Sequence, residues 1–223
     1  CFDVTGTSEH FGVVTDSLCE TELIASPYRG AYVHYGVTAS SGVSLDWGRR
    51  TFGAYPQDIV YGAPVFLPYL RGERAPVFDD SARGMFVGLT ERTDTRMLAY
   101  SVAEGVAMSI RRLYDVLGAP KIDSIRTTGG AAASPLLCRM KASLIGAPVV
   151  TAEPDCGSAL GAVRAAGGAW ESTETVYEPD ARTADFLLPR YEIYARMCAA
   201  WRDITANTAP TSTTLAAESP TSR

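Results

Sequence analysis

A stripe of apolar side chains at helical spacing runs through the middle of this sequence. Its members are Leu98, Val102, Val106, Ile110, Leu113 and Leu117. Gaps of three and four residues place such side chains on one face of an α-helix. Asp94 can cap the start of this helix and Gly118 can end it. The stripe therefore predicts a long amphipathic helix that buries one face in a core.

Strand-like and helical segments alternate along the chain after residue 80, which indicates an α/β layered domain. The patterns predict strands at 3–4, 13–15, 32–35, 65–69, 122–128 and 149–150, and helices at 42–47, 134–144, 158–166 and 191–201. We expect one domain over residues 1–204. From Thr205 onward the residues are mostly small or polar, so 205–223 is predicted to be a disordered tail.

Composition excludes several classes of protein. The 223 residues are 46% hydrophobic and 20% charged, as in globular proteins, and no apolar run reaches the length of a membrane span. A net charge of −5 argues against binding nucleic acid through its phosphates. The five cysteines are scattered and odd in number, which favours free thiols in the cytoplasm. Two histidines are too few for a multi-histidine metal site, so no metal ligands are assigned.

Two glycine-containing turns have the chemistry to hold an anionic ligand. Gly129 and Gly130 follow a predicted strand, and Ser134 begins the next helix, whose N-terminal N–H groups can face an anion. The spacing excludes a P-loop, because no lysine follows. Gly6-Thr7-Ser8 can present backbone N–H groups and two hydroxyls. For each turn by itself, an ordinary turn or hairpin is favoured over a ligand-binding role by roughly four to one.

Taken together and in order, these motifs resemble the carboxyl-terminal half of the FGGY carbohydrate kinases. The resemblance covers about residues 5 to 170 and rests on Gly6-Thr7-Ser8, Phe66 to Pro76 (FLPYLRGERAP), Ala82 to Thr90 (ARGMFVGLT), Ser101–Gly105, Gly129 to Leu136 (GGAAASPL) and Ala159–Ala162 (ALGA). One departure is Met97, which stands where the family usually has a polar residue.

The resemblance implies an actin-like, ribonuclease H-like ATPase domain with a mixed sheet flanked by helices. The family pairs two such domains around ATP and Mg²⁺, and this chain would be the second, nucleotide-binding domain. Gly6 and Thr7 would then line the phosphates, Gly88 the phosphates or ribose, and Gly130 and Ser134 the adenosine. The GERAP stretch resembles xylulokinase-type members, which favours a ketopentose or related polyol as the acceptor of the γ-phosphoryl group.

The same resemblance implies that the catalytic carboxylate and most sugar contacts belong to an amino-terminal domain, so no catalytic residue is assigned. We expect that domain and a small sugar or polyol as partners, with a homodimer also compatible, and expect neither nucleic acid nor membrane. The chain alone should be inactive. Phe66–Tyr69 and the loop from Arg71 to Pro76 are expected to face the missing domain. Two alternatives stay open. The first is a non-catalytic nucleotide-binding or regulatory module. The second is an actin-like ATPase of chaperone or filament type, which the GERAP and ARGMFVGLT stretches argue against.

Overall fold

The computed structural model describes residues 1–18, 23–152, 157–169 and 171–205. Its strands are β1 (Phe2–Thr5), β2 (Glu9–Thr15), β3 (Ile24–Tyr28), β4 (Ala31–Thr38), β5 (Val65–Leu67), β6 (Met85–Val87), β7 (Ile125–Gly129), β8 (Val149–Thr151) and β9 (Thr175–Tyr177). Its helices are α1 (Gly42–Phe52), α2 (Thr95–Val116), the 3₁₀ helix η1 (Gly130–Ala133), α3 (Pro135–Ile145), α4 (Gly157–Ala165) and α5 (Ala181–Thr205).

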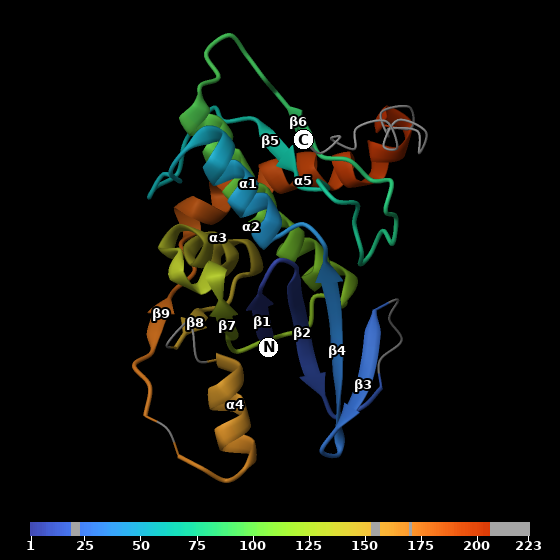
Figure 1. The fold of residues 1–223 in the computed structure, drawn as a ribbon, viewed down its shortest axis with the longest axis vertical. Helices are drawn as coiled ribbons and strands as arrows, with labels where there is room; N and C mark the ends of the chain where they lie inside the picture. Colours follow the sequence, from blue (N-terminus) through green and yellow to red (C-terminus); the bar gives the residue numbers. More distant parts are fainter. Residues whose placement is uncertain (19–22, 153–156, 170, 206–223) are drawn as a thin grey trace, which may run out of the picture.

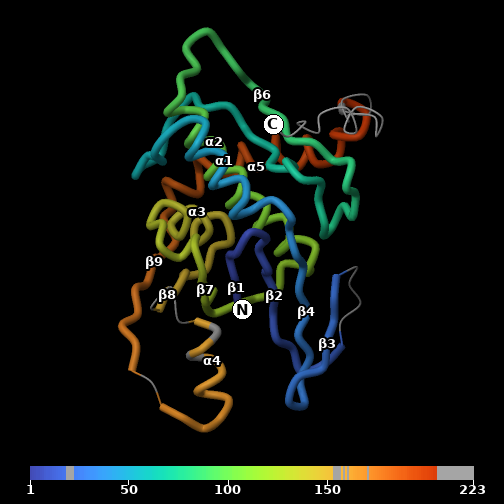
Figure 2. The backbone as a smooth tube through the Cα atoms, in the orientation of Figure 1, coloured from blue at the N-terminus to red at the C-terminus, as the bar shows by residue number. Residues whose placement is uncertain are grey.

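Seven strands form one mixed sheet in the order β3-β4-β2-β1-β7-β8-β9. β1 pairs in parallel with β7, and β7 in parallel with β8, while the other neighbours are antiparallel. β1 and β7 therefore lie side by side in the middle of the sheet although they are far apart in the sequence (Figure 2). β5 and β6 form a separate antiparallel pair among the helices (Figure 1).

The two faces of the large sheet are covered by different helices. α2 packs on β2 and β4, and α3 on β8 and β9, on one face of the sheet. On the other face, Phe2 and Val4 line a cavity of about 210 Å³ together with Gly157 and Gly161 of α4. The helices α1, α2, α3 and α5 gather beyond one end of the sheet, whereas α4 lies beside its other end (Figure 1). The mixed sheet flanked by helices agrees with the predicted fold class. No helix within the described ranges is long and apolar enough to cross a membrane.

The central helix follows the sequence prediction closely. α2 begins after Asp94, whose side chain accepts a hydrogen bond from the Met97 N–H at 2.8 Å, and Gly118 follows its end with φ +83°. All residues from Ala99 to Ile110 are buried, because α1, α3 and α5 pack around this helix in addition to the sheet. The apolar stripe thus predicted this helix. The helices that flank α2 explain why its other faces are buried too.

Other elements differ from the prediction. β3 and β9 were not predicted: β3 is an exposed edge strand that contains Pro27, and β9 has three residues, so neither carries an alternating apolar pattern. The last helix begins at Ala181 rather than Tyr191, capped by Asp180, whose carboxylate accepts from the Thr183 N–H at 2.7 Å. The predicted tail lies outside the described residues, except for Thr205 at the end of α5.

The expectation that Phe66–Tyr69 forms a bare surface is wrong. Phe66 and Tyr69 are 1% and 2% exposed, and Trp47 of α1 stacks on Phe66 with ring centroids 5.7 Å apart. β5 is enclosed by α2 and α5 as well, so this strand is core. In the following loop, Arg71 and Arg74 are exposed while Glu73 is buried.

Candidate functional site

A cavity of about 260 Å³ opens where β1 ends and α1 and η1 begin. Its lining comes from three separate segments of the chain: Thr5, Gly6 and Thr7; Gly42, Leu45 and Asp46; and Gly130 and Ala131. The parallel pairing of β1 with β7 brings the first and last of these segments together, because both follow strands that end at the same edge of the sheet. The cavity is therefore a product of the sheet topology.

The first wall is the tight turn between β1 and β2. The Gly6 N–H donates to Ser8 O at 2.8 Å, and Gly6 and Thr7 are both exposed. The start of α1 presses against this turn: the Val43 N–H donates to Thr7 O at 3.1 Å, and an added Cβ on Gly42 would collide with the Gly6 carbonyl oxygen. Glycine at position 42 thus permits a helix N-terminus to lie directly against the turn.

The opposite wall begins with two glycines that have different roles. Gly129 has φ +89°, and a Cβ there would collide with the Thr5 carbonyl oxygen of the neighbouring strand. Gly130 has no such constraint: it is exposed, and no atom of the described residues lies within 4 Å of where its Cβ would be. The fold therefore needs glycine at 129. At 130, a side chain would project into open space beside the cavity.

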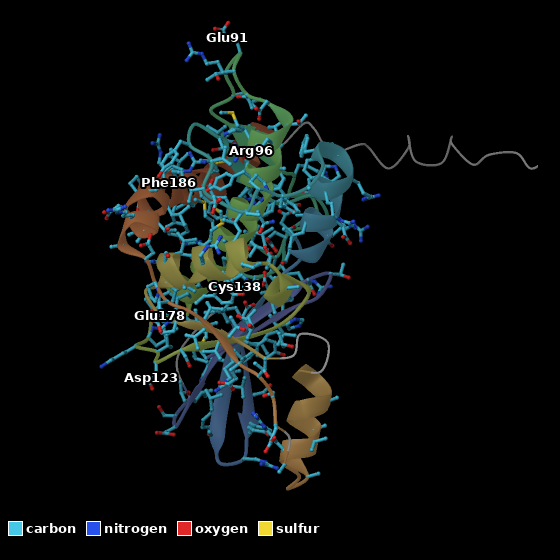
Figure 3. The ribbon with its side chains drawn as sticks, turned by 90° about the vertical axis from the view of Figure 1, so that its left-hand side faces the viewer. Glu91, Arg96, Asp123, Cys138, Glu178 and Phe186 are labelled. Atoms are coloured by element: carbon cyan, nitrogen blue, oxygen red, sulfur yellow. The ribbon has the colours of Figure 1, made fainter. Side chains whose placement is uncertain are left out.

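The structure brings together three of the five residues that the resemblance assigned. Gly6, Thr7 and Gly130 line the cavity. Ser134 caps α3, its hydroxyl accepting from the Leu137 N–H at 3.4 Å, and is not among the lining residues. Gly88, with φ +91°, ends β6 at the base of a loop whose residue Glu91 projects far from the body of the molecule (Figure 3). Gly88 does not line the cavity either.

The α1 side of the cavity was not predicted. Gly42, Leu45 and Asp46 were part of an expected helix, but local sequence does not show which tertiary partner a helix start will have. The signal that could have found them is Ser41-Gly42, a small-residue pair at the start of a helix in a chain with two other glycine turns. Asp46 is exposed and forms an ion pair with Arg49 at 3.6 Å.

A second, shallower cavity of about 380 Å³ adjoins the first and shares Thr7 and Asp46 with it. Its other lining residues are Val43, Arg49, Arg50 and Arg71. Three arginines and one aspartate leave an excess of positive charge on this side of the turn. A helix N-terminus and this charge both favour an anion beside Thr7.

A buried cluster of charges lies beneath the turn. Lys141 of α3 is 1% exposed and contacts both Asp3, with its Nζ 2.7 Å from Oδ2, and Glu9. Burial alone would lower the pKa of Lys141, but the charges of Asp3 and Glu9 raise it. At Glu9, burial raises the pKa, but Lys141 and the hydrogen bonds from Asp3 and Thr5 together lower it below its usual value. Burial and the neighbouring Glu9 raise the pKa of Asp3 to about 8. Of the two carboxyls, Asp3 is therefore the one that takes up a proton first as the pH falls.

This arrangement suits binding rather than proton transfer. The two cavities offer the Thr7 hydroxyl, three arginines and glycine-lined space, which fit a ligand that joins an anionic group to a planar ring. Among the described residues that line them, Asp46 is the only carboxylate, and the described part of the chain holds no group of three or more His, Cys, Asp or Glu side chains that could bind a metal. A metal ion here would depend on a ligand for most of its coordination.

Comparisons with known proteins agree with this geometry. Residues 3–170 match the family model described as the C-terminal domain of the FGGY family of carbohydrate kinases. The chain is 29% identical to a xylulose kinase of Lactococcus lactis over 66% of its own length and 33% of the relative's. It is 32% identical to a glycerol kinase of Alkalilimnicola ehrlichii over 78% of its length and 38% of the relative's.

Solved structures of the same kind are similar throughout the fold. A ligand-bound xylulose kinase from Lactobacillus acidophilus superposes with a TM-score of 0.78 and 26% identity, covering 94% of this chain and 48% of that one. A gluconate kinase from the same organism gives a TM-score of 0.76 and 25% identity over the same shares. The chain thus spans between a third and a half of the length of these relatives.

Proposed function

The chain belongs to the FGGY family of carbohydrate kinases, as a C-terminal domain of that family, and from this we propose that it is the nucleotide-binding half of a sugar kinase. The whole enzyme would transfer the γ-phosphoryl group of ATP to a hydroxyl of a ketopentose or related polyol. Its relatives include enzymes named for xylulose, glycerol and gluconate. The GERAP stretch supports the ketopentose among these acceptors.

The observation that carries the proposal is the cavity shared by Gly6, Thr7 and Gly130. Phosphates would lie at the Gly6-Thr7 turn, where α1 contributes its N-terminus and the adjoining arginines contribute positive charge. Adenosine would lie against Gly130, where the missing side chain leaves room. Ser134 would border the adenosine through the start of α3, which follows η1 directly. We keep Gly88 as a nucleotide residue on the family resemblance alone.

ATP with Mg²⁺ would supply the transferred phosphoryl group and the metal that neutralises its charge. The residues of this chain would bind and orient the nucleotide and hold its phosphates in one position. A carboxylate that takes the proton of the sugar hydroxyl would come from an amino-terminal domain, as would most sugar contacts. The free thiols of Cys1, Cys138 and Cys198 support a reducing compartment, so we place the enzyme in the cytoplasm.

The test is a pair of matched glycine variants of the 223-residue chain, titrated calorimetrically with ADP. Gly130→Val should weaken ADP binding by about tenfold or more, since a loss of 1.4 kcal/mol already corresponds to tenfold. Its melting temperature should change little, because φ at Gly130 is not positive and the space is open. Gly161→Val is the control: it also introduces a Cβ into open space, on α4 away from this cavity.

The control should keep the ADP affinity of the unmodified chain. Gly130→Val that is folded and still binds ADP normally would contradict the assignment of adenosine to this wall. An unmodified chain that binds neither ADP nor ATP at millimolar concentration would contradict the proposed function itself.

A further inference from the structure

Glu9 is the point at which the buried contacts beneath the turn converge. Its Oε1 accepts hydrogen bonds from Thr5 Oγ1 at 2.5 Å and from Lys141 Nζ, and its Oε2 accepts from Ser41 Oγ at 2.7 Å. Glu9, Thr5 and Ser41 are 0%, 4% and 0% exposed. Thr5 directly precedes Gly6, and Ser41 directly precedes Gly42. One carboxylate therefore holds the residue before each of the two glycines that meet at the cavity.

We propose that Glu9 is a positioning residue that locks the Gly6-Thr7 turn against the N-terminus of α1, and so fixes the part of the site that holds phosphate. The proposal rests on the proposed function for the identity of the ligand. The lock itself is a statement about the folded chain, which can be measured without any ligand.

The Ser41 hydroxyl supports this role because it does not cap its own helix. Ser41 occupies the N-cap position of α1, where a serine side chain ordinarily accepts a hydrogen bond from its own helix. Here its hydroxyl donates to Glu9 instead. The first turn of α1 is thus left without a side-chain cap among the described residues, and its N-terminus lies beside the turn and the arginines. The N–H groups of the first turn donate to backbone oxygens instead, Val43 to Thr7 O and Ser44 and Leu45 to Ser41 O, so the start of α1 is held against the turn by its backbone as well.

Lys141 extends the lock to the opposite wall. It projects from α3, the helix that follows Gly130 and η1, and it binds Glu9 and Asp3 together. Asp3 Oδ2 also accepts from Thr127 Oγ1 of β7 at 3.1 Å. The turn, the start of α1 and the strand-to-helix segment after β7 therefore share one buried anchor. A shift of Glu9 would move both walls of the cavity relative to each other.

A buried ion cluster can also act as a purely structural element, and the two roles predict different results. Loss of a structural contact lowers the stability of the whole domain and weakens the binding of all ligands by the same factor. Loss of a lock on the phosphate turn raises the mobility of residues 5–9 and 41–45 and weakens the binding of ADP. Adenosine, which has no phosphate, binds as before. The comparison of ADP with adenosine therefore separates them.

The key variant is Thr5→Val, which keeps the shape of the side chain and removes the hydroxyl that reaches Glu9. Thr5→Ser restores that hydroxyl and is the rescue variant, and Ser41→Ala removes the second link. Ser109→Ala is the control, because Ser109 is a buried serine whose hydroxyl binds Val106 O within α2, at a distance from the cavity in the sequence and the fold. Each is made in the 223-residue chain.

Hydrogen–deuterium exchange is followed for peptides covering 5–9 and 41–45, and ADP and adenosine are titrated by NMR. In Thr5→Val and Ser41→Ala we expect exchange in both peptides to rise by about tenfold and ADP affinity to fall by about tenfold, the factor that 1.4 kcal/mol gives, with adenosine unchanged. Thr5→Ser and Ser109→Ala should keep exchange in both peptides and the ratio of ADP to adenosine affinity close to those of the unmodified chain.

Exchange at 41–45 that stays unchanged in Thr5→Val overturns the lock, because the Thr5 hydroxyl reaches Ser41 through the Glu9 carboxylate. Equal weakening of ADP and adenosine overturns the role in phosphate binding. Failure of the unmodified chain to bind ADP contradicts the proposed function, and the exchange data then still decide whether Glu9 holds the turn.

Discussion

At the scale of single residues, Asp3 makes the stability of the chain depend on pH. Its Oδ1 has no hydrogen-bond partner among the described residues, and burial together with Glu9 raises the pKa of Asp3 to about 8. A proton on Asp3 can be shared with Glu9, which removes one negative charge from the buried cluster. Between about pH 4 and 8 the folded chain therefore keeps a proton that the unfolded chain releases, so stability falls as pH rises.

We expect Asp3→Asn to flatten this dependence. One proton of difference changes the free energy of unfolding by up to about 1.4 kcal/mol per pH unit. Urea unfolding of the unmodified chain should give lower midpoints at pH 8 than at pH 5.5, and the variant should show a smaller decrease. Some decrease should remain, because burial also raises the pKa of Glu73, to about 7.

Asp79→Asn is the control for this experiment. Hydrogen bonds from the hydroxyl and N–H of Ser81 lower the pKa of Asp79, so its loss should not flatten the decrease between pH 5.5 and 8. If Asp3→Asn keeps the full pH dependence of the unmodified chain, Asp3 is ionised in the folded state across this range and does not cause the decrease.

Single residues also show where sequence reasoning succeeds. Asp94 and Ser134 are caps, as predicted, since a cap contacts the backbone three residues ahead and needs no distant partner. The difference between Gly129 and Gly130 could not be predicted, because it depends on how closely β7 approaches Thr5 of β1. The cluster of Asp3, Glu9 and Lys141 could not be predicted either, since these residues meet only after the sheet and α3 have packed.

At the scale of elements, a buried ion pair joins α2 to α5. Arg190 donates from Nε and Nη2 to the two carboxylate oxygens of Glu104, at 2.7 and 2.6 Å, and also to Pro64 O. The Glu104 side chain is 0% exposed and that of Arg190 15%. Because burial raises the pKa of Glu104 while Arg190 lowers it, removal of Arg190 leaves a carboxyl that is costly to ionise.

We expect Arg190→Leu to lower the free energy of unfolding by about 3–5 kcal/mol, the usual effect of leaving one buried charge unpaired. Glu104→Leu combined with Arg190→Leu should be less destabilising than Arg190→Leu alone, because no unpaired charge remains. Arg126→Leu is the control: its ion pair with Glu174 is exposed to solvent, so its loss should change stability little. Urea unfolding of these three variants and of Glu104→Leu alone gives the comparison. A double variant as unstable as the sum of its single variants would show that the pair is not coupled.

The elements that sequence reasoning found are those with a face to bury. α2 and α3 show apolar spacing, caps and terminal glycines together, and both were predicted within a few residues. β3 and β9 lie at the two edges of the sheet and are largely exposed, so solvent imposes no pattern on them. The start of α5 was missed because Pro189 lies inside the helix and argues for a boundary there, whereas packing on α3 and β5 keeps the helix continuous.

At the scale of the whole molecule, the family was predictable from the sequence, and the shape of the cavity was not. Motifs spread over residues 5 to 170 carried the resemblance, and the family model matches 3–170. Three of the five assigned residues line one cavity. The α1 wall was missed, and Phe66–Tyr69 was placed on a surface although it is core, because motif resemblance shows which residues recur and not whether they face solvent.

The whole-molecule proposal predicts that this chain binds nucleotide without phosphorylating a sugar. A general base needs to lie within hydrogen-bond reach of the sugar hydroxyl, and such catalysis typically contributes about 10²- to 10⁴-fold. Asp46, the carboxylate on the described cavity lining, is 71% exposed at its side chain and paired with Arg49, so it is neither shielded nor held for that task.

We therefore expect no sugar-dependent ADP release from the isolated chain with xylulose, glycerol or gluconate in a coupled assay. Adding the amino-terminal domain of the same enzyme in trans should restore turnover, because in the proposed enzyme that domain would close the cleft and supply the carboxylate. The same mixture made with Gly130→Val should stay inactive, since the nucleotide wall is then blocked, whereas Gly161→Val should restore as much activity as the unmodified chain. Turnover by the isolated chain that disappears in Asp46→Asn would place the base in this domain and contradict the division of the active site between two domains.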